Sequence, residues 1–320
     1  MEEKFIQKAV VFNPEDRSGK LKVEKLWELI EDHPYKDKMY IDFEIEKIKN
    51  EIITIDYIDT VFKRVKHFST NYKRKLIKAQ IKDINVFEEI LVIDGEKKKE
   101  IVFQFEEYVI IDEIKENLKT VAKYESKNTY LDEYVMTKYA NSLFKNGFSD
   151  LAKQNIQYFK DLASSSDNYN KHRSYRLVEN DGITYLRGIT SIDKYYEYGV
   201  DFAFVASMLV FHSFMKKSQG VEYEIKSAHI NESKLEIIVA EKFKKDAGEF
   251  GKVSTAIKVS TNDLGQGSLN FLNIIKVGKT DKNGFYLFPK QNRFENNRVI
   301  ISHTTKPENV FATLKALENV

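Results

Sequence analysis

The chain has 320 residues, of which 42% are apolar, and its 51 Lys and Arg residues nearly balance 49 Asp and Glu residues. This apolar content is too high for a disordered protein, and the length is sufficient for one large core or two ordinary ones. The absence of cysteine excludes disulfides, thiolate metal sites and cysteine nucleophiles. The N-terminus lacks the basic and apolar regions of a signal peptide. We therefore expect a cytoplasmic protein that makes no contact with a membrane.

The spacing of apolar residues predicts mixed secondary structure at the start of the chain. Phe5–Phe12 is a predicted strand, whereas Leu21–Ile30 has its apolar residues three and four positions apart, as in a helix. Over Tyr40–Glu46 apolar and polar residues alternate strictly. That alternation predicts a strand with one buried face and one solvated face.

Two predicted hairpins are centred on Asp-Gly pairs, which strongly favour tight turns between strands. The first joins Phe87–Ile93 to Ile101–Ile111 and carries three lysines next to its tip. Helices are expected from Asp112 onward. The second hairpin joins Tyr175–Glu179 to Ile183–Ile189.

The rest of the chain is predicted to be a helix followed by short strands. Ser191–Lys217 is a predicted helix with a break near Gly199. The predicted strands after it are Val221–His229, Leu235–Glu241, Val253–Ser260, Leu269–Val277, Phe285–Phe288 and Val299–Ser302. A last helix is expected to start at Pro307, because proline is well tolerated in the first turn of a helix.

Glycine placement and one polar run divide the chain into two predicted lobes. Only three glycines fall within the first 181 residues, whereas ten follow from Gly182 onward. Tight turns are therefore expected mainly in the second half. Residues 163–168, Ala-Ser-Ser-Ser-Asp-Asn, are suited to a linker. We predict an α+β protein with a mixed N-terminal lobe, residues 1–163, and a C-terminal lobe rich in antiparallel strands, residues 164–320.

The strongest local signal for function is the basic segment 62–82, which holds eight cations and no acid. Phosphates attract such cations because neutralisation releases condensed counterions, and unpaired bases stack on flat aromatic faces. The nucleic-acid-binding residues predicted in this segment are Lys63, Arg64, Lys66, Phe68, Tyr72, Lys73, Arg74, Lys75 and Lys78. The alternative is a solvated helix whose aromatics point into the core and whose cations pair with the acidic stretch 42–59.

Three arginines on the arms of the second hairpin form a further candidate. If the two strands pair around Asp181-Gly182, then Arg176 and Arg187 lie near each other, with Arg173 farther along the same strand as Arg176. Guanidinium groups in such a cluster bind phosphate or carboxylate with two parallel hydrogen bonds. The alternative interpretation is that these arginines are ordinary exposed surface residues that bind no ligand.

No catalytic or metal-binding pattern survives comparison with simpler explanations. The six histidines have no paired ligand spacing, and neither a Gly-x-Ser-x-Gly motif nor a P-loop is present. Asp42, Glu44 and Glu46 share a face of the predicted strand, but neighbouring carboxylates there are roughly 7 Å apart along the strand. They would need partners from elsewhere to bind one ion. We predict no catalytic residue, no metal and no cofactor.

The C-terminal half carries several short motifs in a recognisable order. They are His172–Val178 (His-Arg-Ser-Tyr-Arg-Leu-Val), Tyr185–Arg187 on the paired strand, and Thr261–Ser268 (Thr-Asn-Asp-Leu-Gly-Gln-Gly-Ser) after a later strand. With them, residues 172–284 resemble the phage/plasmid-like protein family, whose domain has no known function. The resemblance implies a gene of a mobile genetic element, without known catalytic residues or substrate.

These patterns favour a non-enzymatic binding protein, located in the host cytoplasm if a phage encodes it. The first hypothesis is nucleic-acid binding, with a single strand favoured because the near-neutral charge argues against coating a duplex. The second is a protein-binding inhibitor of a host defence complex, or an assembly component or homo-oligomer. Its 18 Tyr and 22 Phe residues supply interface anchors. The third is an enzyme whose site is assembled from distant residues.

Overall fold

The computed structural model describes residues 4–165, 171–192, 194–218, 220–242, 244–264, 268–278, 284–287 and 298–317. Its mixture of helices, a curled antiparallel sheet and a closed barrel confirms the predicted α+β class. The chain forms two compact units: unit 1 is Met1–Thr70 with Tyr196–Val320, and unit 2 is Asn71–Tyr195. This division differs from the predicted boundary between residues 163 and 164, because one unit is inserted within the other and a single boundary cannot describe an insertion.

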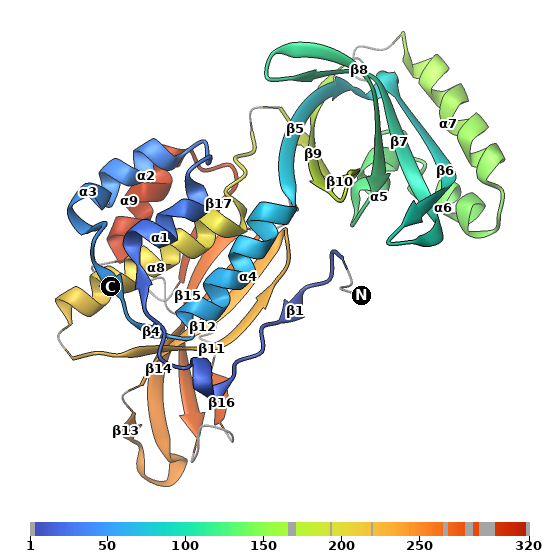
Figure 1. Ribbon diagram of the computed structural model, residues 1–320. Coiled ribbons are helices and arrows are strands. Elements are labelled where there is room, and N and C mark those ends of the chain that lie inside the picture. The colour runs from blue at the N-terminus through green and yellow to red at the C-terminus, as the bar shows by residue number, and fades with distance from the viewer. Residues whose placement is uncertain are drawn as a thin grey trace. The chain divides into compact units, whose positions relative to one another are not determined.

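Unit 1 is built on a curled, mainly antiparallel sheet (Figure 1). Its strands are β1 (Lys8–Ala9), β4 (Ile55–Asp56), β11 (Tyr223–Ile230), β12 (Lys234–Glu241), β13 (Lys245–Asp246), β14 (Lys252–Asn262), β15 (Ser268–Gly278), β16 (Gly284–Leu287) and β17 (Arg298–Ser302). The main path runs β1-β11-β12-β14-β15-β16, and β4 pairs with β11 in parallel. A separate two-stranded pair consists of β2 (Leu21–Lys22) and β3 (Ile52–Ile53).

The helices of unit 1 come from both ends of the chain. They are α1 (Val23–Trp27), α2 (Lys36–Asp42), α3 (Ile45–Ile48), α4 (Ile58–Asn71), α8 (Gly199–Lys217) and α9 (Pro307–Leu317), with the 3-10 helices η1 (Pro14–Asp16), η2 (Glu28–Ile30) and η4 (Gly248–Phe250). The N-terminal helices and the C-terminal sheet therefore belong to one core, although more than 120 residues separate them in the sequence.

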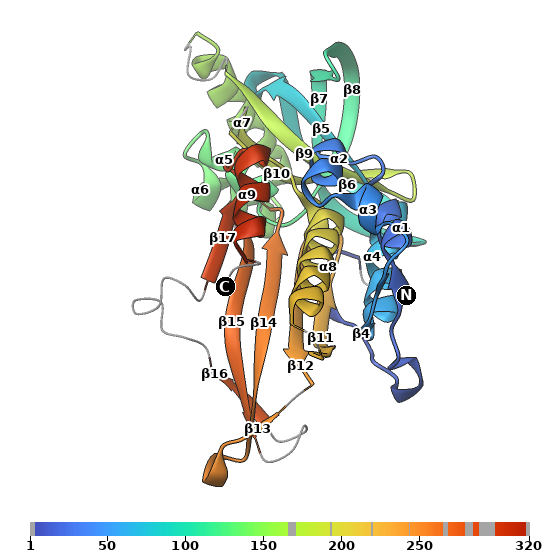
Figure 2. The same cartoon turned by 90° about the vertical axis from the view of Figure 1, so that its left-hand side faces the viewer.

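Helix α8 is the centre of unit 1 (Figure 2). All of its residues from Gly199 to His212 are buried, and it packs against β12 and β14 as well as against α1, η2 and α9. A helix that is covered on every side must be apolar all round, and this explains its composition. The same composition makes α8 long and apolar enough to cross a membrane, but 78% of that apolar stretch is buried within the protein.

Unit 2 contains a six-stranded sheet that closes into a barrel. The strands are β5 (Lys73–Gln80), β6 (Ile84–Ile93), β7 (Glu96–Ile110), β8 (Glu113–Ala122), β9 (His172–Asn180) and β10 (Ile183–Ser191). Five of them form the ring β5-β9-β10-β8-β7, which closes where Lys78 of β5 lies opposite Val109 of β7. The 3-10 helix η3 (Ile81–Asp83) connects β5 to β6, and β6 continues the pairing along β7.

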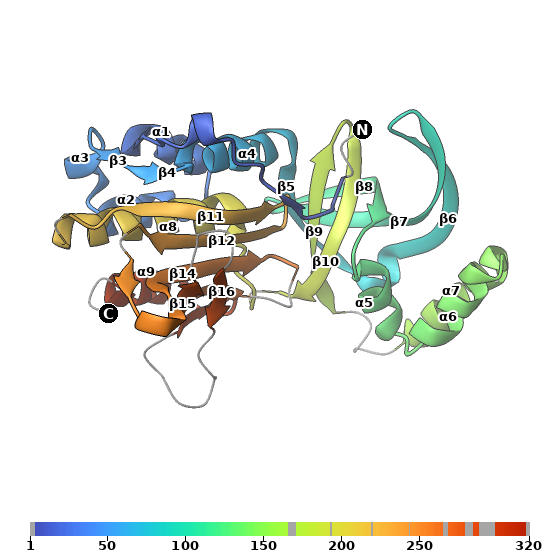
Figure 3. The ribbon, with the colours of Figure 1, turned by 90° about the horizontal axis from the view of Figure 1, so that it is seen from below.

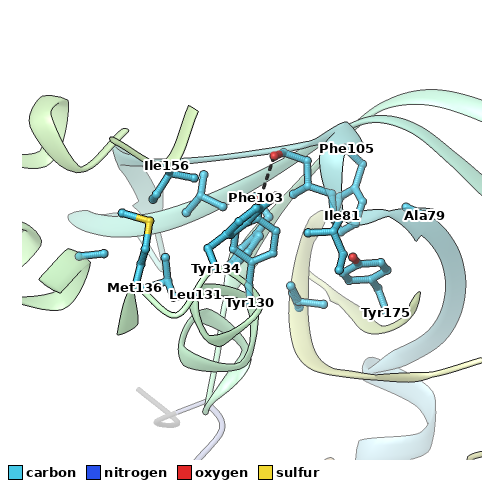
Figure 4. Close-up of a cluster of buried hydrophobic side chains, with 14 of the residues drawn as sticks. Ala79, Ile81, Phe103, Phe105, Tyr130, Leu131, Tyr134, Met136, Ile156 and Tyr175 are labelled. Atoms are coloured by element: carbon cyan, nitrogen blue, oxygen red, sulfur yellow. Dashed lines mark hydrogen bonds between the residues drawn. The ribbon is translucent and has the colours of Figure 1, made fainter. Parts of the chain in front are cut away.

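Three helices follow β8 and complete the core of unit 2. They are α5 (Ser126–Asp132), α6 (Thr137–Lys145) and α7 (Ser149–Ala163), and Figure 3 shows α6 and α7 side by side. In the core, Phe103 and Phe105 of β7 pack edge-on against Tyr130 and Tyr175, respectively (Figure 4). The buried hydroxyl of Tyr130 donates a hydrogen bond to the carbonyl oxygen of Ile84 at 3.0 Å, which satisfies its polar tip.

Both predicted Asp-Gly turns are confirmed. Asp94 and Gly95 have φ angles of 56° and 79°, and Asp181 and Gly182 have 51° and 74°. Two successive residues with positive φ are the signature of the turn that best matches the twist of a hairpin. The strands predicted after residue 220 and the helix from Pro307 are also confirmed within a few residues.

The predicted helix Ser191–Lys217 is confirmed only from Gly199, and the predicted strand Phe5–Phe12 only at Lys8–Ala9. Two other predictions of secondary structure are wrong. Tyr40–Glu46 is not a strand: it includes the end of α2 and the start of α3, with Glu44 at φ 49° between them and Ile41 largely exposed. The segment after Asp112 is strand β8 and not a helix, because it pairs with β7 along nearly its whole length. In both places tertiary contacts outweighed a short local pattern.

Candidate nucleic-acid interface

The basic segment 62–82 does not form one surface element. Its first part belongs to helix α4 and its second part to strand β5, and the division between the two units falls between Thr70 and Asn71. The predicted cations are therefore shared between two bodies. The segment therefore supplies two separate candidate surfaces, one in each unit.

The aromatic residues of the segment point into the protein and not to solvent. Phe62 and Phe68 are buried on the inner face of α4, and Tyr72 is buried at the start of unit 2. A base cannot stack on a ring that is covered by protein. The predicted stacking role of Phe68 and Tyr72 is therefore wrong, and the alternative interpretation, in which these rings belong to the core, describes them correctly.

The cations of α4 are arranged as on an ordinary amphipathic helix. Lys63 is exposed, while the Lys66 ammonium lies 2.7 Å from the Glu28 carboxylate. The Arg64 guanidinium lies 4.5 Å from the centre of the Phe68 ring, a cation–π contact. Two of the three cations thus have partners within unit 1, which lowers their attraction for an external phosphate.

Strand β5 carries the second group of cations. Lys73 and Lys75 are exposed, Arg74 and Lys78 are half-buried, and inward-facing Ile77 joins the barrel core. Lys75 forms an ion pair with Glu179 of β9. Because β5 and β9 are antiparallel, with Lys73 opposite Glu179, these cations lie next to the Asp181-Gly182 turn.

The three hairpin arginines are less accessible than the sequence suggested. Arg176 and Arg187 are almost completely buried, and the Arg176 guanidinium lies 4.1 Å from the centre of the Tyr195 ring. Arg173 is half-buried and forms an ion pair of 3.0 Å with Glu133. Arg176 lies opposite Gly188, directly beside Arg187, so the predicted proximity is confirmed. The burial of Arg176 and Arg187 contradicts both predicted interpretations, a contact patch on the surface and ordinary exposed residues.

A cluster that sequence reasoning missed joins β6, β8 and α7. Phe87 is half-buried, and the ammonium groups of Lys119 and Lys153 lie 5.7 Å and 5.3 Å from the centre of its ring. Lys119 also forms an ion pair of 2.7 Å with Glu89. No sequence motif marks this cluster, because its members come from β6, β8 and α7 and meet only through strand pairing and helix packing.

The tip of the β6–β7 hairpin adds three consecutive lysines. Lys97 and Lys99 are exposed, and Lys98 is half-buried. Lys98 lies 3.3 Å from Glu96 and Lys99 lies 2.5 Å from Glu88. Unit 2 as a whole has 21 Lys and Arg residues against 20 Asp and Glu residues, a net charge of +1. Such a balanced surface argues against coating a duplex and restricts phosphate binding to local groups of cations.

In unit 1, one carboxylate pairs with two basic side chains. The buried His212 imidazole lies 2.7 Å from Glu51, and Lys216 lies 2.8 Å from the same carboxylate. The Lys216 ammonium is the main cause of the lowered pKa of Glu51. Within the parts of the chain that the structure describes, no group of three or more His, Asp or Glu side chains is placed to hold a metal ion.

No protein-family model matches the sequence, and no curated protein or solved structure matches the chain. The resemblance to the phage/plasmid-like protein family therefore stays a prediction. Residues 265–267, in the middle of its Thr261–Ser268 motif, lie outside the described part of the chain.

Proposed function

We propose that this protein is a non-enzymatic binding protein and that its barrel, unit 2, binds single-stranded nucleic acid. The observation that supports this proposal is the topology of the barrel. The exposed cations at its two hairpin turns supply the chemistry that phosphates require.

The five strands follow the order of oligonucleotide-binding OB barrels. Counted along the barrel as strands 1 to 5, they are β5 with its continuation β6, then β7, β8, β9 and β10. Strand 1 pairs with strands 2 and 4, strand 3 pairs in parallel with strand 5, and the helices α5 to α7 lie between strands 3 and 4. OB barrels bind oligonucleotides or oligosaccharides on the face of strands 2 and 3 and with the loops after strands 1 and 4. The proposal therefore uses the shared strand order of this barrel and the OB barrels.

In this barrel exposed cations lie beside both of these loops, and a half-buried aromatic ring lies on strand 1. The loop after strand 1 is the Asp94-Gly95 turn, which is followed by three lysines. The loop after strand 4 is the Asp181-Gly182 turn, beside Lys73 and Lys75. Phe87, on strand 1, is half-buried, and the ammonium groups of Lys119 and Lys153 lie near its ring. Phosphate neutralisation by lysine and stacking on a ring are the two contacts that a single strand uses.

The experiment is a titration of the full-length protein against labelled single-stranded DNA, single-stranded RNA and duplex DNA at several salt concentrations. We expect single strands to bind more tightly than the duplex, and the logarithm of affinity to fall linearly with the logarithm of salt concentration. Two charge-reversal variants test the location: Lys73→Glu/Arg74→Glu/Lys75→Glu on β5 and Lys97→Glu/Lys98→Glu/Lys99→Glu at the hairpin tip. Each should weaken binding at least tenfold and flatten the salt dependence by about one unit of slope for each phosphate that the protein no longer neutralises.

Matched controls separate a site from a general charge effect. Lys36→Glu/Lys38→Glu/Lys47→Glu makes the same change of charge on α2 and α3 of unit 1 and should leave affinity unchanged. Lys63→Glu/Arg64→Glu/Lys66→Glu tests helix α4. Absence of binding at low salt would disprove the proposal. Loss of binding in the α4 variant alone would move the interface to unit 1.

A further inference from the structure

Helix α7 lies at an edge of unit 2 (Figure 1) and carries an apolar stripe whose side chains are largely exposed. The side chains that pack into the barrel core are Ala152 and Ile156, next to the buried Lys160. On an adjacent face of the same helix, five large apolar side chains are 42–62% exposed. They are Phe148, directly before the helix, and Leu151, Tyr158, Phe159 and Leu162.

This stripe is too regular to be scattered surface apolarity. Phe148, Leu151, Asn155, Tyr158 and Leu162 are spaced by alternating steps of three and four residues, which is the spacing of a helix seam that meets another helix. From their exposed fractions, the five apolar side chains present about 500 Å² of surface, near the upper end of the patches that monomers expose. A surface of this kind is expected to be covered by a partner.

The stripe is also symmetric about its middle residue. Phe148 and Leu162 lie seven residues before and after Asn155, and Leu151 and Phe159 lie four residues before and after it. In an antiparallel pair of identical helices related by a two-fold axis at Asn155, each of these aromatic side chains would meet a leucine of the other copy. Large and small side chains then alternate across the contact, the arrangement that fills a helix interface without voids.

Asn155 is suited to the centre of such a pair. Its amide nitrogen donates one hydrogen bond to the carbonyl oxygen of Leu151 at 2.8 Å. The amide group has a second N–H and a carbonyl oxygen, so two copies facing each other on the axis can hydrogen-bond reciprocally. A single polar asparagine in an apolar helix seam is a known way to define register.

We propose that the partner of this stripe is a second copy of the chain, bound through an antiparallel, two-fold contact between the two α7 helices. A two-fold contact uses the same patch twice, so the two stripes together bury about 1,000 Å² of apolar surface, before polar flanks are counted. That area reaches the lower limit for a specific interface. This inference does not depend on the proposed binding of nucleic acid.

The first test is the mass of the full-length protein in solution, measured by sedimentation over a hundredfold range of concentration. We expect a species of twice the 37.5 kDa chain mass at the upper concentrations. Leu151→Glu and Tyr158→Glu should return it to the monomer. Ile114→Glu, at a position of unit 2 that is 67% exposed outside the stripe, should leave the dimer intact. Circular dichroism should show all variants folded.

The second test examines register and uses the absence of native cysteine. On the two-fold axis, Asn155→Cys should oxidise to a covalent dimer, whereas Gln157→Cys, on the opposite side of the helix, should stay monomeric under the same conditions. A monomer at every concentration would overturn the proposal, and so would a dimer that tolerates Leu151→Glu. A dimer in which Gln157→Cys crosslinks and Asn155→Cys does not would also overturn it.

Discussion

The two units place their longest helices in opposite environments. Helix α8 of unit 1 is apolar on all sides and is enclosed by a curled sheet and other helices. Helix α7 of unit 2 packs against its barrel with one face and leaves an adjacent apolar face exposed. The comparison shows that apolar residues in a helix do not by themselves indicate where its surface is. Only the number of elements packed around the helix decides whether an apolar face is core or interface.

The units also differ in how the chain builds them. Unit 2 is one continuous segment, whereas unit 1 combines the N-terminal helices with strands that follow more than 120 residues later. A continuous segment whose barrel closes on itself satisfies most strand edges internally. A discontinuous unit depends on contacts between segments that are distant in sequence, and these are slower to form.

The largest expected effect comes from removing one buried ring in each unit. Phe202→Ala in α8 and Phe103→Ala in β7 each create a cavity in a fully buried position, and each should lower the free energy of unfolding by about 3–5 kcal/mol. In calorimetry we expect two transitions, with each substitution lowering the melting temperature of its own unit. Phe202→Leu and Phe103→Leu should show smaller effects of the same kind. If both substitutions shifted one common transition, the two units would unfold together, and their independent stability would be disproved.

The next largest effect is the loss of stability when a glycine that has close neighbours is replaced by alanine. A Cβ atom on Gly19, in unit 1, would lie 2.3 Å from the backbone oxygen of Ile55, which cannot move aside. A Cβ atom on Gly188, in unit 2, would lie 2.4 Å from the Arg176 guanidinium, the flexible end of a side chain. We expect Gly19→Ala to cost about 3 kcal/mol and Gly188→Ala about 1 kcal/mol. Urea unfolding measures both, with Lys20→Ala as an exposed control.

The opposite order would contradict this prediction. If Gly188→Ala destabilised the protein more than Gly19→Ala, the buried guanidinium would be more rigid than a backbone segment. That result would point to an essential role for Arg176 in holding the barrel.

The smallest expected effect is the contribution of the ionised Glu51 carboxylate to stability, which is lost at acid pH. Its pKa is below the normal value of 4.5, chiefly because Lys216 hydrogen-bonds to its ionised form, with His212 adding to the effect. The unfolded chain therefore binds more protons than the native state in this range, so the stabilisation is present above about pH 4.5 and is lost as pH falls through the lower native pKa. Glu51→Gln should lower the melting temperature at neutral pH and have little effect at strongly acid pH.

Melting curves of wild type and Glu51→Gln from neutral to acid pH measure this difference. Glu179→Gln is a matched variant in unit 2, because Lys75 lowers the pKa of Glu179 by the same kind of contact. Glu179→Gln should lower the melting temperature at neutral pH by a smaller amount than Glu51→Gln, since Glu51 contacts two basic groups. A Glu51→Gln effect that does not change with pH would show that the ion pair contributes nothing.

Much of the fold could be predicted where the local pattern and the tertiary role agree. The strands predicted after residue 220 formed within a few residues of their expected bounds, and both Asp-Gly hairpins formed as expected. The prediction failed where a short pattern was compatible with two structures. Ile41, Phe43 and Ile45 alternate with polar residues as in a strand, yet they belong to two short helices and the turn between them.

The candidate site could be predicted only in part. Of the cations predicted on β5, Lys73 and Lys75 are exposed, because lysines next to a turn remain solvated in almost any fold, whereas Arg74 and Lys78 are half-buried. The predicted stacking residues Phe68 and Tyr72 are buried, because a sequence by itself does not show which side chains tertiary packing covers. The cluster around Phe87 was missed because its residues are more than 30 positions apart.

The sequence by itself determined the class of the fold, the positions of the tight turns and most strands of the C-terminal half. These features depend on neighbouring residues, whose conformational preferences act over a few positions. Tertiary structure alone decided the insertion of one unit into the other, the closure of the barrel, and which aromatic rings are buried. Those features depend on which distant segments pair and pack, and burial of apolar surface depends on all contacts of the folded chain together.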